Sequence, residues 1–330
     1  MIKTLLKFIF AFGIVYWLVK QGNLDFSLIM KLSDYKLNAT ITILILFFHN
    51  IMTALRWKIL LEIKSSKTIK MFDGIRLTWI GIFFNTVLPG AVTGDIIKIL
   101  YAKDLDPKLD RSFLLSSIFA DRLFGLIGLM SLLGVSSIIN YNELISISPK
   151  LKNLIHFNFL IFGGILSLLA TFFIPKKIQN YILKLIKFIP VINKKLAKLV
   201  QQVWLIGSDK KTVLKCFFIS SFTQTFYIYS FWNIISPFIT VDISLSKIYS
   251  FIPLGLATTA IPISPAGLGV GHAAFDKLFS LFQINGGASY FNIFFIFLVC
   301  INLTGIIPYL LSGKKHNIDE AEMEAEQLAN

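Results

Sequence analysis

The chain has 330 residues, of which 55% are hydrophobic and only 15% are charged, and its net charge is +14. Soluble globular proteins carry about 25% charged residues, so this composition, with a mean hydropathy of +0.72, excludes an ordinary soluble enzyme. It predicts an all-α, polytopic membrane protein. The longest polar stretch is about forty residues, shorter than the roughly 100 residues of a typical soluble catalytic domain.

Six apolar runs are long enough to cross a bilayer, which takes about 20 helical residues. They lie at about 1–20, 38–60, 112–139, 157–175, 213–237 and 290–312. The first run resembles a signal peptide, but it ends in Tyr-Trp-Leu-Val-Lys rather than in a small-residue cleavage site. We therefore expect an uncleaved helix.

Two further apolar regions, about 74–102 and 248–283, are interrupted by proline and glycine at 85–95 and 262–272. Backbone groups freed by such breaks persist in a membrane only where protein or a polar cavity satisfies them. Two breaks in corresponding positions of two halves are typical of transporters built from inverted repeats. We expect two broken or re-entrant helical hairpins, the alternative being that each region crosses the membrane fully.

The distribution of lysine and arginine predicts the orientation. The stretch from Lys176 to Lys215 contains ten lysines and a single acid, Asp209, so it should face the cytoplasm of an inner-membrane protein. This constraint is met if the first broken region enters and leaves from the cytoplasm, the second enters and leaves from outside, and both termini are cytoplasmic. Full crossings would place the lysines outside, so hairpins are preferred, in an arrangement that fits an inverted repeat.

The basic segment at 176–212 alternates lysines with apolar residues at roughly helical spacing between Ile178 and Val203. This pattern predicts amphipathic helices on the inner membrane surface, attracted to anionic inner-leaflet lipid. The aromatic residues belong to the apolar runs, so no nucleic acid is expected as a partner. The predicted organisation is a transmembrane domain at 1–315 and an acidic cytoplasmic tail at 316–330.

Asp121 and Arg122 lie about nine residues into their span, roughly 14 Å along the helix and near the bilayer centre. Charges at that depth mark a functional site or a structural ion pair, and Arg122 could offer a forked cation to a phosphate. Adjacent helical residues point about 100° apart, so at least one of the two needs a partner elsewhere. Gly125 and Gly128 share the Asp121 face and should admit another helix, for which a broken helix is the candidate.

In the first break, Pro89 and Gly90 end one half-helix and Gly94 can begin another, whose free N–H groups favour an anion. Asp95 could cap that helix or bind substrate or a proton. Lys98 could bind phosphate or extend toward the membrane surface.

In the second break, Gly267 and Gly269 resemble part of a dinucleotide fingerprint, but no strand–helix–strand context surrounds them, so we expect close-packed backbone and no cofactor. His272 could relay protons or touch a headgroup, or it could be a packing residue. Ser264 has no base at a readable spacing, so no catalytic residue is predicted, and no metal site is predicted either. The candidate substrate-binding residues are Asn85, Pro89, Gly90, Gly94, Asp95, Lys98, Asp121, Arg122, Ser264, Pro265, Gly267, Gly269 and His272.

Two polar stripes run along single faces of the predicted spans at 38–60 and 213–237, and each could line a polar path or make hydrogen bonds between helices. They consist of Asn50, Thr53 and Arg56, and of Thr223, Gln224 and Tyr227.

The chain resembles the transmembrane region of lysylphosphatidylglycerol synthases, a flippase-like family, over nearly its whole length. The resemblance is carried by the Leu-Pro-Gly and Gly-Asp segments within 85–98, by the Asp121-Arg122 pair and by the segment 262–270. The resemblance implies a membrane domain that moves, or assists with, anionic or aminoacylated phospholipids and, in other members, isoprenoid-linked or hopanoid lipids. Asp95 and Lys98 stand where the family more often has Glu and Arg, and Ala266 where Gly is usual. The charges are kept, but lysine lacks the bidentate geometry of arginine.

The chain ends at Asn330 without the soluble transferase domain of full-length synthases, so we expect no enzyme activity of that kind from it. The leading hypothesis is a translocator of an anionic, aminoacylated or isoprenoid-linked lipid, downhill or ion-coupled because no nucleotide motif is visible. The alternatives are an embedded enzyme or accessory subunit in glycolipid or polyprenyl-phosphate metabolism, and an anchor for a separate cytoplasmic enzyme. A homo-oligomer is a further expected partnership.

Overall fold

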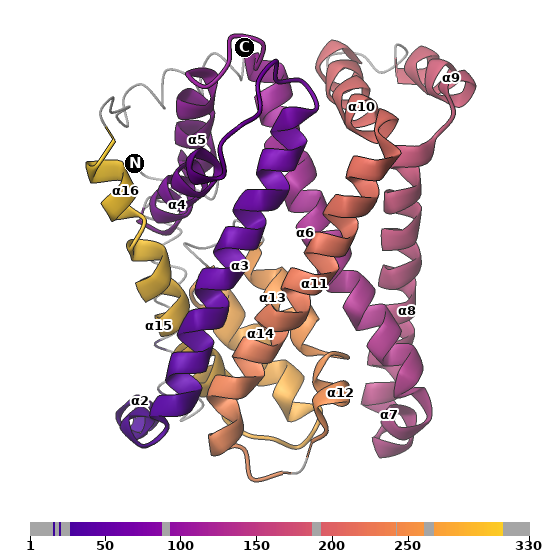
Figure 1. The fold of residues 1–330 in the computed structure, drawn as a ribbon. Helices are drawn as coiled ribbons and strands as arrows, with labels where there is room; N and C mark the ends of the chain where they lie inside the picture. Colours follow the sequence, from indigo (N-terminus) through magenta and orange to yellow (C-terminus); the bar gives the residue numbers. More distant parts are fainter. Residues whose placement is uncertain are drawn as a thin grey trace.

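The computed structural model describes residues 16, 20, 27–87, 93–186, 193–241, 243–260 and 267–312. Within these ranges every regular element is a helix, as the composition predicts (Figure 1). The longer elements are α3 (Lys36–Glu62), α4 (Met71–Val87), α5 (Thr93–Lys103), α6 (Arg111–Ile139), α8 (Pro149–Ala170), α9 (Lys176–Ile186), α10 (Asn193–Ser208), α11 (Lys210–Ile235), α13 (Ile252–Ala260), α14 (Val270–Ser280) and α15 (Gly287–Leu303). The short ones are α2 (Ser27–Met30), η1 (Lys31–Asp34), α7 (Tyr141–Ile147), η2 (Thr171–Phe173), η3 (Ser236–Phe238), α12 (Leu245–Ile248) and α16 (Ile306–Leu310).

Four described helical stretches are long and apolar enough to cross a membrane: Lys36–Glu62, Arg111–Ile139, Pro149–Phe173 and Gly287–Leu310. They contain or overlap four of the six predicted spans. The predicted span at 213–237 forms the 26-residue helix α11, which is not among the four, and the predicted span at 1–20 lies almost entirely outside the described residues. The structure therefore confirms a helical protein with several apolar spans, without reaching the predicted number of six.

The third of these spans begins earlier than the predicted position 157. Ser148 caps α8 by accepting a hydrogen bond from Leu151 N at 3.2 Å, and Pro149 occupies the first turn. Proline suits that position because its missing N–H would have no helical partner there. The apolar run marked the membrane-compatible part of the helix, while the cap sets its actual start.

Both interrupted regions form pairs of short helices. Helices α4 and α5 pack against one another in the upper half of Figure 1, and α13 and α14 do so in the lower half. In chain order, the first pair lies between the long helices α3 and α6, and the second lies between α11 and α15. The connecting residues 88–92 and 261–266, which include Pro89, Gly90, Ser264 and Pro265, lie outside the described residues.

The two helix pairs contribute to different apolar cores. One core surrounds α4 and α5 and includes Trp57, Leu77, Ile97 and Phe113. The larger one is rich in phenylalanine from α11, α14 and α15, where the rings of Phe231 and Phe275 stack with their centroids 4.5 Å apart. Stacked and edge-on ring pairs add to the free energy gained by burying apolar area. Each pair of short helices is thus fixed in place by its own set of neighbours.

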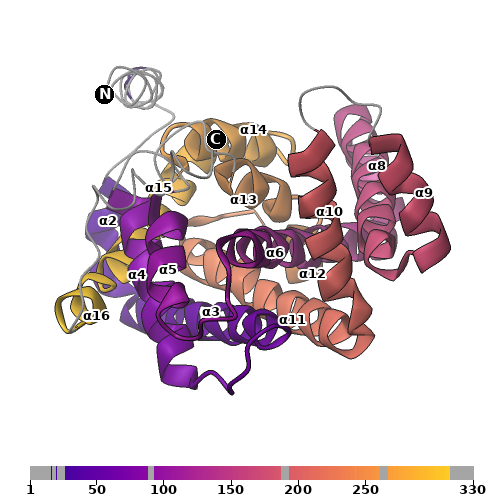
Figure 2. The same ribbon diagram turned by 90° about the horizontal axis from the view of Figure 1, so that it is seen from above.

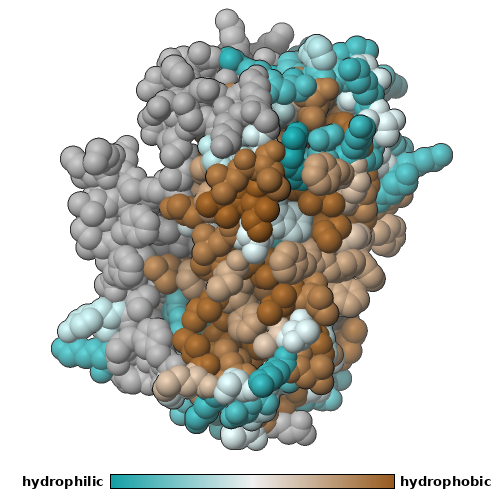
Figure 3. Space-filling model, turned by 60° about the vertical axis from the view of Figure 1, so that its left-hand side comes forward, coloured by the Kyte–Doolittle hydropathy of each residue, from teal (hydrophilic) through white to brown (hydrophobic). Residues whose placement is uncertain are grey.

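The outer surface fits a membrane environment. Figure 3 shows a broad hydrophobic band between hydrophilic upper and lower rims on the face that it draws. Large apolar side chains point outward from the long helices, among them those of Leu44, Phe157, Leu160, Phe218 and Phe222. An exposed apolar belt of this kind is costly in water and is expected where lipid covers it.

The predicted amphipathic segment forms α9 and α10, both at the upper end of the molecule (Figures 1 and 2). The single acid of this segment, Asp209, caps α11: its carboxylate accepts hydrogen bonds from the Lys211 and Thr212 backbone N–H groups and from the Thr212 hydroxyl. The Thr212 hydroxyl bond is the main reason that the pKa of Asp209 lies below its usual value. The predicted acidic tail at 316–330 lies outside the described residues.

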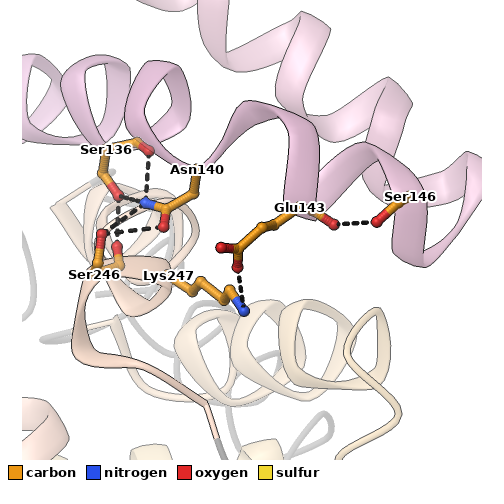
Figure 4. Close-up of polar contacts among 6 residues, drawn as sticks. All are labelled: Ser136, Asn140, Glu143, Ser146, Ser246 and Lys247. Atoms are coloured by element: carbon orange, nitrogen blue, oxygen red, sulfur yellow. Dashed lines mark hydrogen bonds and ion pairs between the residues drawn. The ribbon is translucent and has the colours of Figure 1, made fainter.

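At the lower end, polar side chains tie the end of α6 to α12 (Figure 4). Asn140 Nδ2 donates to Ser246 Oγ at 2.8 Å, and Ser136 Oγ donates to the Ser246 carbonyl at 2.6 Å. Lys247 forms an ion pair with Glu143 of α7 at 2.6 Å. Since α12 leads directly into α13, these contacts anchor the base of the second helix pair.

At the upper end, Asp106 joins the two loops that flank the first helix pair. One carboxylate oxygen accepts hydrogen bonds from Ser66 N at 2.6 Å, Ser66 Oγ at 2.7 Å and Ser65 Oγ at 2.9 Å, and the other accepts from Lys108 N at 2.9 Å. Bonds of this kind favour the charged form, and the Lys108 backbone bond is the largest cause of a pKa well below the usual Asp value. The α3–α4 and α5–α6 loops therefore lie together at one end of the molecule.

Asp106→Asn should lower the melting temperature of the detergent-solubilised protein at neutral pH, because the charged acceptor of four hydrogen bonds is lost. The pKa is lowered on folding, so the stabilisation is complete above the unfolded pKa of about 3.9 and is lost as pH falls through the lower folded value. Melting curves of wild type and variant should thus differ at pH 7 and converge below about pH 4. If the difference in melting temperature between wild type and variant stayed constant down to pH 2.5, the charge of Asp106 would not be the cause of the stabilisation.

Candidate functional site

At the tip of the first helix pair, near the end of α4 and the start of α5, Asn85 and Gly94 bring the two helices into close contact. A Cβ atom on Gly94 would lie 2.0 Å from the Gly81 carbonyl oxygen and 2.7 Å from Asn85 N, so the backbones of α4 and α5 can approach this closely only with glycine. Gly94 N donates to Asn85 Oδ1 at 2.9 Å, and Asn85 Nδ2 donates to Asp95 Oδ1 at 3.2 Å. Asn85 thereby satisfies one free N–H of the new helix and orients the carboxylate.

Asp95 connects this tip to the middle of α6. Its second carboxylate oxygen lies 2.5 Å from Arg122 Nη2. The Arg122 side chain is still 45% exposed, whereas that of Asp95 is 14% exposed. The Arg122 side chain is therefore ion-paired to Asp95 and yet nearly half exposed.

Asp121, the neighbour of Arg122, is held by a different helix. Arg56 of α3 donates from Nε to Asp121 Oδ1 at 2.7 Å and from Nη1 to Ser220 Oγ of α11 at 2.8 Å. Both charged side chains are nearly buried, with 5% and 10% exposed. The prediction that at least one of Asp121 and Arg122 has its partner elsewhere is confirmed, since each pairs with a residue of another helix.

The glycines on the Asp121 face do admit close neighbours, although these are not the broken helices that we expected. A Cβ on Gly128 would lie 2.8 Å from Ser220 of α11, and one on Gly125 would lie 3.5 Å from the Arg56 guanidinium. The space left by these two glycines is therefore occupied by the unbroken helix α11 and by the guanidinium group of Arg56. A small-residue pattern predicts that something packs closely but does not identify the partner.

Lys98 is buried rather than extended to the membrane surface. It is 6% exposed, and its Nζ lies 3.6 Å from the centroid of the Trp57 ring. The Trp57 Nε1–H donates to Ser117 Oγ at 3.1 Å, which fixes the indole. A cation over an indole face is stabilised by the ring quadrupole, so Trp57 helps to hold this charge inside the protein.

These groups surround one cavity of about 160 Å³. Its lining comes from four helices, α3, α4, α5 and α6. The lining residues are Thr53, Thr78, Gly81, Ile82, Asn85, Asp95, Lys98, Ile118, Asp121 and Arg122. The structure thus brings five predicted residues, Asn85, Asp95, Lys98, Asp121 and Arg122, into the wall of one cavity, with Gly94 packed directly behind it.

Arg56, which was not among the candidate substrate-binding residues, lies beside the cavity and is ion-paired to its lining residue Asp121. Its spacing from Asn50 and Thr53 did mark a polar face of α3, and Thr53 reaches the cavity. Arg56, Lys98 and Arg122 carry three positive charges against the two negative charges of Asp95 and Asp121. The described surroundings of the cavity therefore carry one net positive charge.

The second break has a different local structure. Gly267 and Gly269 have φ of 79° and 80°, a left-handed conformation that favours glycine, as close-packed backbone requires. His272 is fully buried, with Nδ1 3.3 Å from Gly269 N and Nε2 3.2 Å from Asn292 Oδ1 of α15. These contacts match the packing alternative for His272, and none of the three residues lines the charged cavity.

Across the described ranges, no group of three or more His, Cys, Asp or Glu side chains is arranged to hold a metal ion. A forked guanidinium and a buried ammonium are both donors suited to phosphate oxygens, so the charged cavity has groups that can bind an anion.

A family model described as the lysylphosphatidylglycerol synthase TM region matches residues 4–311. The chain therefore belongs to this family of membrane proteins connected with lipids, as its motifs predict. Comparisons with curated proteins and with solved structures give no match.

Proposed function

We propose that this member of the lysylphosphatidylglycerol synthase transmembrane family is a lipid translocator, which moves an anionic, aminoacylated or isoprenoid-linked lipid across the inner membrane. The phosphate-bearing headgroup would pass through the charged cavity lined by Arg122, here called the Arg122 cavity. The observation that carries the proposal is the cavity lined by Lys98 and by a half-exposed Arg122, whose described surroundings carry one net positive charge once Arg56 is included. Charged groups this deep in an apolar protein normally serve a ligand path or an ion pair. Here Arg56 and Asp121 form the buried pair, while Arg122 remains accessible.

The arrangement of the helix pairs supports alternating access to such a site. In this proposal, α4 and α5 enter and leave from the cytoplasmic side, α13 and α14 do so from outside, and both chain termini are cytoplasmic. The positions of the two pairs in opposite halves of Figure 1 support it, as does the lysine-rich segment at the same end as the loops joined by Asp106. Opposed hairpins of this kind are a feature of inverted-repeat transporters.

Binding and passage, rather than catalysis, is the role proposed for the charged residues. Asp95 and Asp121 each face an arginine, so neither is poised as a free base in this arrangement. The basic helices α9 and α10 would rest on anionic lipid at the cytoplasmic face.

Arg122→Ala and Lys98→Ala should each slow headgroup movement by about 10–100-fold, because a hydrogen bond to a charged group contributes about 1.5–3 kcal/mol. The measurement is the rate at which fluorescent phosphatidylglycerol crosses the bilayer of proteoliposomes, after equal insertion and folding of all variants is confirmed. Lys67→Ala, which removes an exposed lysine from the α3–α4 loop, is the matched control and should retain the wild-type rate.

Wild-type rates in both cavity variants would refute passage through this cavity. If wild type moves none of phosphatidylglycerol, lysylphosphatidylglycerol or a polyprenyl phosphate, the accessory-subunit hypothesis would be preferred.

A further inference from the structure

A second and larger cavity lies at the upper end of the molecule, away from the charged site. Its volume is about 740 Å³, within the range of about 300–1,000 Å³ typical of ligand sites. It shares no lining residue with the Arg122 cavity. Its walls come from η2, α9 and α10 and from Lys210, the first residue of α11.

The part of the cavity wall formed by η2 and α10 is tightly packed. A Cβ on Gly207 would lie 2.3 Å from the Phe172 carbonyl oxygen, so α10 crosses η2 in direct backbone contact. Phe172 and Trp204 are nearly buried, with 2% and 7% exposed. The apolar wall is therefore held in shape by the protein and does not depend on a ligand to form.

The charges at the rim have one sign. Among the described lining residues the charged ones are Lys176 and Lys210, both exposed. The carboxylate nearest in sequence, Asp209, is occupied by its hydrogen bonds to the start of α11. An anionic group would thus meet two ammonium groups at the rim, while an attached apolar chain would meet Phe173, Leu183 and Leu205.

The position of the cavity identifies the kind of anion. The apolar span Pro149–Phe173 ends at its wall, and the basic helix α9 begins at its rim. The end of a span is the level of lipid headgroups. Next to the rim, α9 also exposes Ile178 and Tyr181, as a helix lying in the membrane interface does.

From these observations we propose that the cavity between η2, α9 and α10 is a binding site for one anionic phospholipid, with its phosphate between Lys176 and Lys210 and part of an acyl chain against Trp204. This lipid is a resident of the cytoplasmic leaflet and is not the transported molecule. It would fix the basic helices α9 and α10 on the membrane at the end of α8.

Trp204 provides a direct test, because bromine atoms on an acyl chain quench a nearby indole. Protein is reconstituted into phosphatidylcholine vesicles that contain increasing fractions of brominated phosphatidylglycerol or, separately, brominated phosphatidylcholine. The Trp204 signal is the difference between wild type and Trp204→Phe. We expect half-maximal quenching at a mole fraction of brominated phosphatidylglycerol several-fold lower than that of brominated phosphatidylcholine.

Lys176→Gln with Lys210→Gln should raise the phosphatidylglycerol fraction needed for half-maximal quenching by at least about fivefold, the effect of one lysine near an anionic surface. The control, Lys67→Gln with Lys70→Gln, removes the same charge from the α3–α4 loop and should change nothing; circular dichroism checks that each variant is folded. Equal quenching by the two lipids in wild type, or an unchanged preference in the Lys176/Lys210 variant, would overturn the proposal. Loss of the preference on adding millimolar inorganic phosphate would also overturn it, by indicating a site for small anions.

Discussion

Arg56→Ala is expected to lower the free energy of unfolding by about 3–5 kcal/mol, the cost of removing one partner of a buried ion pair. The substitution leaves the Asp121 carboxylate, whose side chain is only 10% exposed, facing a cavity without its cation. It also removes the hydrogen bond from Arg56 to Ser220, which joins α3 to α11. The measurement is unfolding of the purified protein in mixed micelles as the fraction of denaturing detergent is raised.

A double substitution separates lost charge compensation from lost packing. Replacing a buried pair with apolar residues of similar size is often neutral, so Arg56→Met combined with Asp121→Leu should recover most of the lost stability. Headgroup movement is not expected to recover fully, because Asp121 lines the cavity. A loss of less than about 1 kcal/mol in Arg56→Ala, the usual value of an exposed pair, would show that water reaches and screens this pair.

Asp121 and Arg122 were predictable from the sequence because ionisable residues stand out in a long apolar run. Arg56 was expected only as part of a polar stripe and not as a candidate site residue, since it lies near the end of its span and beside Lys58 and Lys64, where cations are expected for reasons of orientation alone. The polar stripe that it forms with Asn50 and Thr53 gave the correct face of α3. Helical periodicity identifies the face of a helix on which a residue lies. It does not identify the helix that packs against that face, and here the partner residue Asp121 lies 65 positions further along the chain than Arg56.

The paired short helices were predictable for a related reason. Proline and glycine interrupt both apolar regions, and Gly267 and Gly269 do adopt positive φ. The sequence placed charges in the first break and close-packed backbone in the second, but it left residues of both among the candidate substrate-binding residues. The first closes around charges contributed by α6, whereas the second closes around His272 and Asn292 within a phenylalanine core. That difference depends on which neighbours each pair contacts, and a local pattern does not contain this information.

The number of spans shows a further limit. Helix α11 is 26 residues long, but serines, threonines and Gln224 on its inner faces lower its hydropathy. These polar groups are satisfied within the protein: Ser220 accepts a hydrogen bond from Arg56 of α3, and the Thr223 hydroxyl donates to the Ile219 carbonyl one turn earlier in α11 itself. A helix can carry polar residues on the faces that meet other helices without exposing them to lipid, so the hydropathy of a span depends on its neighbours as well as on whether it crosses the membrane.

Gly94→Ala should separate α4 from α5 and abolish headgroup movement. The new methyl group would lie 2.0 Å from the Gly81 carbonyl oxygen and 2.7 Å from Asn85 N. Both are backbone atoms, so no side-chain rotation can relieve the clash, and we expect a cost at or above the upper end of the roughly 1–3 kcal/mol typical of overpacking. Separation of the helices would also break the Gly94–Asn85 and Asn85–Asp95 hydrogen bonds that orient Asp95 toward Arg122.

Two matched glycine substitutions separate this effect from the general consequences of replacing glycine in a helix. Gly163→Ala in α8 has no atom within 4 Å of the new methyl group and should be neutral or slightly stabilising, since alanine is favoured over glycine in a helix interior by about 0.5–1 kcal/mol. Gly81→Ala, whose methyl group would lie 3.3 Å from the Gly94 carbonyl oxygen, should be intermediate. Stability in mixed micelles and transport in proteoliposomes should therefore fall in the order Gly163→Ala, Gly81→Ala, Gly94→Ala. If Gly94→Ala kept wild-type transport, close contact between these two helices would not be what positions the charged cavity.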